Sequence, residues 1–218
     1  MGRLIVIEGL DGSGKATQAA KLAAHLQSIG ERVQHVSFPN YKSDSSALVR
    51  LYLSGAMGAA GDVNAYAASC FYAVDRYCSF EMDWKKQYEA GYTILADRYA
   101  TSNAVHQMTK LPKEEWDGYL AWMEDFEYTK MHIPRPDMVL YLDMHPDTSR
   151  VLLEKRYAGD LSKRDIHESD IAYLYACRKA ALYAAERLKW QVLRCCDGKN
   201  PFPVEDIFAD ILSGLQRE

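Results

Sequence analysis

The sequence predicts an α/β fold in which a parallel sheet of about five short strands is covered by helices on both faces. Short β-branched or apolar runs alternate along the chain with longer segments of helical periodicity. Strands that alternate with helices pair in parallel through crossover connections. A glycine-rich segment also lies directly between the first strand and the first helix.

The elements can be assigned in order from the N-terminus. Residues 4–7 form a β-branched run that stops at Gly9, and residues 14–29 carry one apolar helical stripe that stops at Gly30. Residues 156–168 have few large apolar side chains and many charged ones, so a mobile flap and a plain surface loop both remain open. The other strands are predicted at 33–37, 93–96, 138–142 and 191–195, and the other helices at 45–54, 64–90, 114–128, from about 146, 171–189 and 204–215.

Composition narrows the class of protein. A chain of 218 residues suits one domain, residues 1–218, with at most a small mobile insert. Its net charge of −4 argues against a general nucleic-acid binder. Five cysteines without a CxxC pair indicate a reduced, cytoplasmic protein. No signal-peptide pattern and no apolar run long enough to cross a membrane are present in the sequence.

The glycine-rich segment reads Gly9-Leu10-Asp11-Gly12-Ser13-Gly14-Lys15. A strand before it and a helix after it are the context that a phosphate-binding loop requires. Glycines let successive backbone N–H groups curve around phosphate oxygens, and the helix N-terminus adds its positive end. Lys15 reaches the outer phosphates as a point charge. The predicted ATP-binding residues are Gly9, Asp11, Gly12, Ser13, Gly14, Lys15, Ala16 and Thr17.

One position departs from the loop pattern. The residue after the lysine is normally Ser or Thr, whose hydroxyl binds magnesium, but here it is Ala16. Thr17 is rotated by about 100° around the helix from that position. Two interpretations stay open: magnesium is held by the phosphates, water and carboxylates alone, or the enzyme is weakened or inactive.

Further motifs extend along most of the chain: residues 7–15, Phe38-Pro39-Asn40-Tyr41, Tyr72-Ala73-Val74-Asp75-Arg76, Asp97-Arg98-Tyr99 followed by Ser102-Asn103, and residues 136–143. Together these motifs resemble those of the thymidylate kinase family. This resemblance implies a three-layer P-loop NTPase fold with a short lid and a kinase that transfers phosphate from ATP to dTMP with Mg²⁺. It also implies a homodimer that binds small-molecule substrates, while the composition above predicts a cytoplasmic protein without a nucleic-acid or membrane partner.

The resemblance assigns roles around the acceptor phosphate and sugar. Asp11, which ATP phosphates would repel, turns in the family toward the 3′-hydroxyl of the acceptor. Arg98 would clamp the acceptor phosphate, for which its planar fork is suited, and a strand-end arginine lies where ligands bind in parallel sheets. Asp97 would support magnesium through water.

The resemblance also assigns a pocket for the base. Tyr72 and Arg76 lie four residues apart on a predicted helix and share a face. In the family, the first stacks on thymine and the second bonds its carbonyl edge, while Asn103 resembles the residue at the N3 edge. His106 stands where the family often has tyrosine, which puts the preference for deoxyribose in doubt. The implied acceptor-binding residues are Asp11, Phe38, Tyr41, Tyr72, Arg76, Arg98, Ser102, Asn103 and His106.

Phosphoryl transfer needs positive charge near the moving group. Some family members carry an arginine inside the loop, but Gly12 and Ser13 show that this chain does not. The basic residues of the predicted flap resemble the alternative, a lid at about 156–168 that brings Arg156 or Arg164 to the site. The predicted catalytic residues are Lys15, Arg98, Asp11, Arg156 and Arg164.

Two other functions remain open. His106 makes a kinase for another pyrimidine monophosphate, dUMP or UMP, the nearest alternative. Ala16 motivates a nucleotide-binding protein that no longer transfers phosphate.

Overall fold

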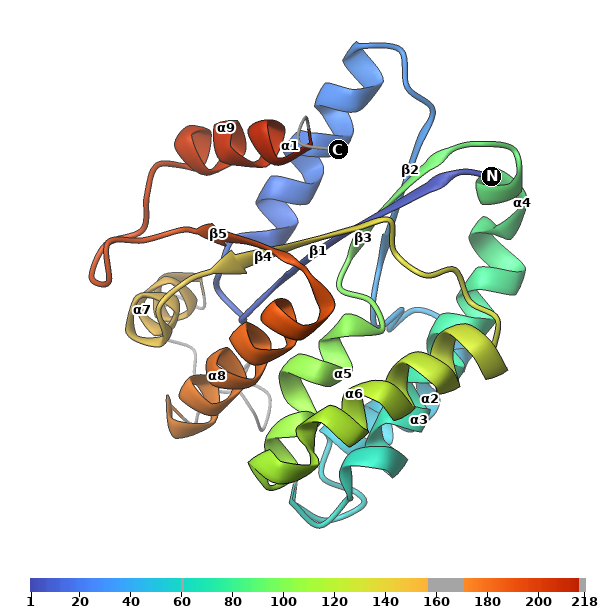
Figure 1. Ribbon diagram of the computed structural model, residues 1–218, viewed down its shortest axis with the longest axis vertical. Coiled ribbons are helices and arrows are strands. Elements are labelled where there is room, and N and C mark those ends of the chain that lie inside the picture. Colours follow the sequence, from blue (N-terminus) through green and yellow to red (C-terminus); the bar gives the residue numbers. More distant parts are fainter. Residues whose placement is uncertain (60, 157–170, 216–218) are drawn as a thin grey trace.

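A computed structural model describes residues 1–59, 61–156 and 171–215, with only the backbone of residues 155 and 156. Five parallel strands form one sheet in the order β2-β3-β1-β4-β5, which confirms the predicted sheet (Figure 1). The β1 strand is central, so the segment that follows it emerges at the middle of the carboxyl edge. The strands are β1 Arg3–Gly9, β2 Val33–Ser37, β3 Thr93–Asp97, β4 Met138–Asp143 and β5 Gln191–Arg194.

Helices cover both faces of the sheet, as the sequence predicts. Alternate residues of β1 point to opposite sides: Leu4 and Val6 join one buried cluster, and Ile5 and Ile7 join the other. The second cluster lies under α1 and α9, and the first under helices that include α5, α6 and α8 (Figure 1). The α-helices are α1 Lys15–Ser28, α2 Ala47–Leu53, α3 Ala65–Ser79, α4 Lys85–Glu89, α5 Thr101–His106, α6 Trp116–Glu124, α7 Pro146–Arg156, α8 Ile171–Leu188 and α9 Val204–Leu215.

The long helical pattern predicted over residues 64–90 is confirmed, although the helix is not an α-helix throughout. A π-helical turn, Phe80–Trp84, separates α3 from α4, and it brings the side chains of Phe80 and Trp84 into the core. The helix predicted at 114–128 likewise passes from α6 into a π-helical turn, Asp125–Lys130. A π turn inserts one residue into the helical repeat and changes which side chains face inward.

The short helix α5 was not predicted from the sequence. The predicted helix at 45–54 begins with a 3₁₀ turn, Asp44–Ser46, before α2. The predicted lid falls largely outside the described residues. Nothing of the Arg156 side chain or of Arg164 is described either, so their catalytic roles stay predictions. Among the helices that are described, none has both the length and the apolar character required to cross a membrane.

Candidate active site

The glycine-rich loop joins β1 to α1, which confirms the strand–loop–helix context that the motif requires. Gly12 and Gly14 have φ angles of 77° and 88°, in the left-handed region that disfavours side chains. A Cβ atom on Gly12 would also lie 2.7 Å from the carbonyl oxygen of Ser149 in α7. Gly12 is therefore required both by its backbone conformation and by the close approach of α7.

Lys15 is held inside this loop at the first turn of α1. Its side chain is almost fully buried, and Nζ donates hydrogen bonds to the carbonyl oxygens of Gly9 at 2.9 Å and Leu10 at 2.8 Å. Burial and the nearby charge of Arg98 lower the pKa of Lys15 to about 8, although Asp11 and Asp97 act in the opposite direction. The loop thus holds an ammonium that loses its proton within reach of physiological pH.

This lowered pKa predicts how ATP binding depends on pH. Lys15 is charged below its pKa of about 8 and increasingly neutral above it, so the attraction for phosphate weakens as pH rises. We expect kcat/KM for ATP to fall by about tenfold per pH unit above pH 8. The pH profile of kcat should show a higher apparent pKa, because the phosphates of bound ATP stabilise the charged form of Lys15. Steady-state kinetics across the pH range measure both. A kcat/KM for ATP that stays level to about pH 9.5 would contradict the assignment.

Arg98 and Asp11 form an ion pair across the carboxyl edge of the sheet. Arg98 Nη2 donates to Asp11 Oδ1 at 2.5 Å. Burial by itself would raise the pKa of Asp11, but the charges of Arg98 and Lys15 hold that pKa well below its usual range. Arg98 has φ 68°, a left-handed conformation that is strained for a residue other than glycine and that is found preferentially at functional sites.

His106 and Tyr173 extend this pair. The Arg98 guanidinium can only donate, so its 2.9 Å contact between Nη1 and His106 Nε2 requires that Nε2 accepts. The imidazole proton then lies on Nδ1, which is 3.1 Å from Tyr173 Oη and 3.6 Å from Cys177 Sγ. The two rings are stacked with centroids 6.2 Å apart. Sequence reasoning missed Tyr173, because α8 is distant in the chain and nothing in its local pattern distinguishes this tyrosine.

A cavity of about 940 Å³ opens at this edge of the sheet. Its lining includes the loop residues 11–17, Asp97 at the end of β3, and Tyr173. Gly9 is the one predicted ATP-binding residue outside this lining. The structure thus brings all the predicted acceptor-binding residues into one cavity with the phosphate loop. These residues are Asp11, Phe38, Tyr41, Tyr72, Arg76, Arg98, Ser102, Asn103 and His106.

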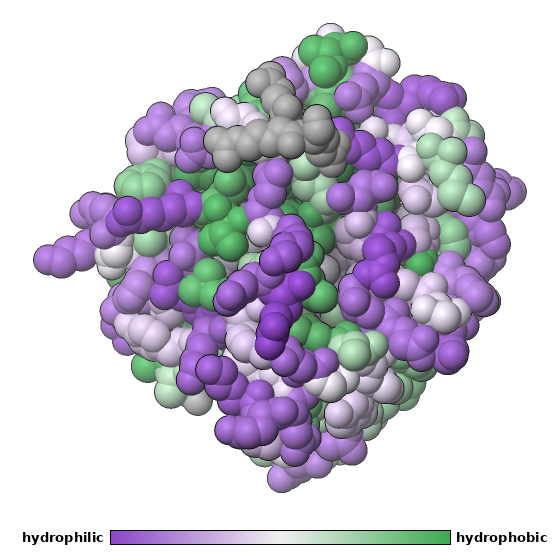
Figure 2. Space-filling view, viewed as in Figure 1, coloured by the Kyte–Doolittle hydropathy of each residue, from purple (hydrophilic) through white to green (hydrophobic). Residues whose placement is uncertain are grey.

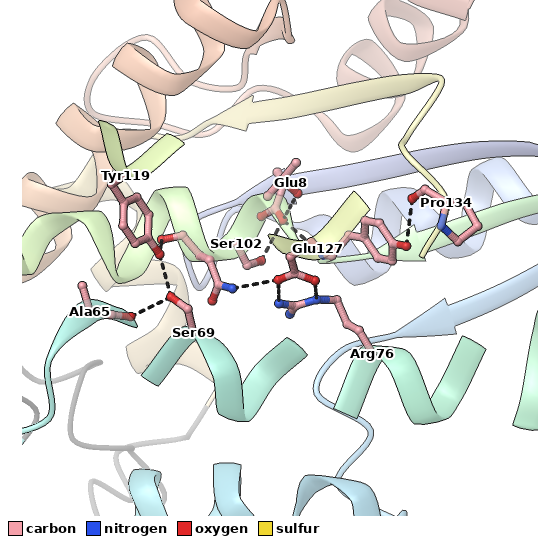
Figure 3. Close-up of polar contacts among 11 residues, drawn as sticks. Glu8, Ala65, Ser69, Arg76, Ser102, Tyr119, Glu127 and Pro134 are labelled. Atoms are coloured by element: carbon pink, nitrogen blue, oxygen red, sulfur yellow. Dashed lines mark hydrogen bonds and ion pairs between the residues drawn. The ribbon is translucent and has the colours of Figure 1, made fainter. Parts of the chain in front are cut away.

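Ser102 is also part of a buried network. Its hydroxyl donates to Oε1 of Glu8 at 2.7 Å, and the same oxygen accepts from Thr101 Oγ1 at 2.7 Å and from the Tyr99 amide (Figure 3). Glu8 is fully buried on β1 and fixes the beginning of α5, the helix that carries Asn103 and His106. Sequence reasoning missed this role of Glu8, which needs contacts across two neighbouring strands.

The residues near the loop can accommodate magnesium in one specific way. Ala16 offers no side-chain oxygen, and the described residues contain no group of three or more carboxylate, histidine or cysteine ligands. The Asp97 carboxylate lines the cavity and accepts no hydrogen bond from the described residues. A hydrated Mg²⁺ bound mainly by phosphates needs only such a carboxylate from the protein, so the residues fit this ion.

One cavity that holds both a phosphate loop and the arginines Arg76 and Arg98 has the arrangement typical of a P-loop nucleotide kinase, in which a donor and an acceptor nucleotide bind side by side. The thymidylate kinase family model matches residues 7–203. The chain belongs to the thymidylate kinase family, and it is therefore a phosphotransferase that uses ATP.

Individual relatives agree with this assignment. The thymidylate kinase of Mycobacterium tuberculosis strain CDC 1551 / Oshkosh is 28% identical over 185 residues, which cover 83% of this chain and 84% of that one. The thymidylate kinase of Bifidobacterium longum strain DJO10A is 30% identical over 155 residues, covering 70% and 72%. A solved thymidylate kinase from Candida albicans has the same fold, with a TM-score of 0.68 at 20% identity over 99% of this chain and 91% of that one.

Proposed function

We propose that this protein transfers the γ-phosphoryl group of ATP to dTMP and releases dTDP and ADP, a step toward dTTP. The observation that carries the proposal is one cavity that the phosphate loop shares with two groups of side chains. Tyr72, Arg76 and Asn103 are suited to a base, and the Arg98–Asp11 ion pair is suited to the phosphate and sugar of a nucleotide. Family membership supports the same reaction.

The side chains act by positioning and by charge neutralisation. An oxygen of the acceptor phosphate attacks the γ-phosphorus, and the bond to the oxygen that bridges the β- and γ-phosphorus breaks, so that ADP leaves. Arg98 donates to the acceptor phosphate and keeps it in line, while Asp11 orients Arg98 and accepts from the 3′-hydroxyl. Lys15 exchanges its loop carbonyl partners for the outer phosphates of ATP.

Magnesium belongs to this proposal. Asp97 would hold the ion through one of its waters, and the nucleotide phosphates would supply the direct ligands. The bound ion would neutralise charge on the phosphates. Ala16 is compatible with this arrangement because no hydroxyl ligand from the loop is needed.

The proposal also covers the lid, the assembly and the compartment. We infer a single domain, 1–218, whose lid at about 156–168 supplies Arg156 or Arg164, since the loop has no arginine of its own. We infer a homodimer formed through α3, on which Tyr66, Val74 and Tyr77 expose more than a third of their surface. The free state of all five cysteines fits a reducing cytoplasm.

The decisive experiment is a substrate panel. Purified protein is given ATP and magnesium with dTMP, dUMP, UMP or dCMP, and ADP release is measured. We expect the highest kcat/KM with dTMP. A preference for UMP would overturn the assignment in favour of another pyrimidine nucleotide kinase, and tight ATP binding without turnover would indicate a nucleotide-binding protein.

A further inference from the structure

A buried carboxylate lies behind the part of the cavity assigned to the base. Glu127 is 1% exposed and comes from the π-helical turn Asp125–Lys130 that follows α6. It is absent from the cavity lining, but it contacts Arg76 of α3 and Asn103 of α5, and both of these line the cavity. Figure 3 shows Arg76 and Glu127 facing each other between these elements. Among the described residues, Glu127 is therefore joined to the base pocket by hydrogen bonds to two lining side chains, Arg76 and Asn103.

The contact with Arg76 determines which edge of its guanidinium is bonded to Glu127 and which part faces the cavity. Arg76 Nε donates to Glu127 Oε2 at 3.0 Å, and Nη2 donates to Oε1 (Figure 3). No acceptor for Nη1 is present among the described residues. A guanidinium has no acceptor atom, so the free part of Arg76 can offer only hydrogen-bond donors to the cavity.

The contact with Asn103 fixes the orientation of an amide. Asn103 Nδ2 donates to Glu127 Oε1 at 3.1 Å. An ionised carboxylate can only accept, so the amide must turn its NH₂ group toward Glu127. The carbonyl Oδ1 is then the polar atom left for the cavity, and no group in the described part of the chain donates to it.

The backbone of Asn103 is held in place as well. Its carbonyl oxygen accepts from the Gln107 amide at 2.9 Å and lies 3.4 Å from Tyr119 Oη, which donates its single proton to Ser69 Oγ at 2.6 Å. Ser69 Oγ donates in turn to the Ala65 carbonyl at 2.7 Å (Figure 3). Asn103 therefore has little freedom to change its position, and its choice of rotamer depends on the partner of its amide.

We propose that Glu127 is a positioning residue that sets the hydrogen-bond polarity of the base pocket, a donor from Arg76 beside an acceptor from Asn103, and thereby selects thymine or uracil over cytosine. The imide edge of thymine and uracil offers an N3–H donor and an O4 acceptor, which complement this pair. Cytosine offers an N3 acceptor and an N4 donor at the same edge, so both contacts are mismatched. A site built for one hydrogen-bond pattern rejects the reverse pattern because its buried polar groups stay unpaired. The inference rests on the proposed function, since it requires a pyrimidine nucleotide as acceptor.

Glu127→Gln tests this inference, because glutamine keeps the size of the side chain but adds a donor. Asn103 can then turn its amide and present NH₂ to the cavity. We expect the ratio of kcat/KM for dTMP over dCMP to fall about a hundredfold, through a higher KM for dTMP and a higher rate with dCMP. The KM for ATP should stay at the wild-type value, since the Arg76 and Asn103 contacts are distinct from the phosphate loop.

Two further variants separate polarity from packing. Glu127→Asp retains a carboxylate that only accepts, so it should keep the preference for dTMP even if affinity falls. Glu124→Gln makes the same chemical change on α6, where the carboxylate pairs with the exposed Arg135, and it should leave the ratio unchanged. A folded Glu127→Gln enzyme with the wild-type ratio overturns the inference.

Circular dichroism checks folding. If Glu127→Gln does not fold, the double variant Arg76→Gln/Glu127→Gln removes the unpaired buried charge and still frees the Asn103 amide. Its ratio should fall as well, and a wild-type ratio would overturn the inference. Calorimetric affinities for dTMP and dCMP are measured in parallel, so selectivity is read without turnover. A wild-type protein that binds dTMP over dCMP but releases no ADP would refute the proposed reaction and leave the pocket polarity supported.

Discussion

Replacement of Arg98 by alanine is expected to lower kcat for dTMP phosphorylation by about a thousandfold. The guanidinium bonds Asp11 at 2.5 Å and lies at the carboxyl edge of the sheet, where the acceptor phosphate would bind. Its loss removes charge from the transition state and leaves the Asp11 carboxylate without its main partner. Steady-state kinetics at saturating ATP measure the effect on kcat and on the KM for dTMP.

Controls distinguish this role from a general loss of stability. Arg187→Ala removes an exposed arginine that pairs with Asp117 at 2.7 Å, and its kcat should match the wild type. Arg98→Lys keeps the charge but loses the planar fork, so intermediate activity is expected. Thermal unfolding reports any change caused by the left-handed backbone at this position. Retention of kcat within about tenfold in a folded Arg98→Ala enzyme would rule out the proposed clamp.

Replacement of Lys15 by alanine is expected to lower kcat/KM for ATP by about a hundredfold to a thousandfold. The phosphate loop itself holds this ammonium, which donates to the Gly9 and Leu10 carbonyls and which we propose turns to the ATP phosphates when they bind. The affinity for dTMP should change much less, because the acceptor side depends on Arg98 and the base pocket. Kinetics with ATP varied and calorimetry with dTMP measure the two effects separately.

Lys21→Ala is the matched control on the same helix. Lys21 lies near the surface of α1 and donates to Glu205 at 2.7 Å, so its loss should leave kcat/KM for ATP at the wild-type value. If Lys15→Ala stayed within about threefold of wild type for ATP, the loop would not be the donor site.

The sheet was predictable because its strands are short β-branched runs and because parallel pairing follows from the alternation with helices. The π-helical turns that interrupt the α-helices were not predictable from the sequence. The π turns at Phe80–Trp84 and Asp125–Lys130 contain no Gly, Pro or other residue that marks the end of a helix. The first turn places Phe80 and Trp84 in the core, and the second buries Glu127 against Arg76, and both contacts depend on distant parts of the chain. The helix α5 has six residues, too few to produce a clear period.

The sequence by itself determined the phosphate loop and the Asp97-Arg98 pair, because backbone conformation and strand-end position are local properties of the chain. Only the tertiary structure decided which side chains from distant segments hydrogen-bond to the residues of the site. Tyr173 contacts His106 although the two lie 67 residues apart in the sequence, and Glu127 contacts Arg76 across a separation of 51 residues. The hydrogen-bond polarity of Asn103 depends on that distant carboxylate, because an amide can present either end until a buried neighbour accepts from one of them.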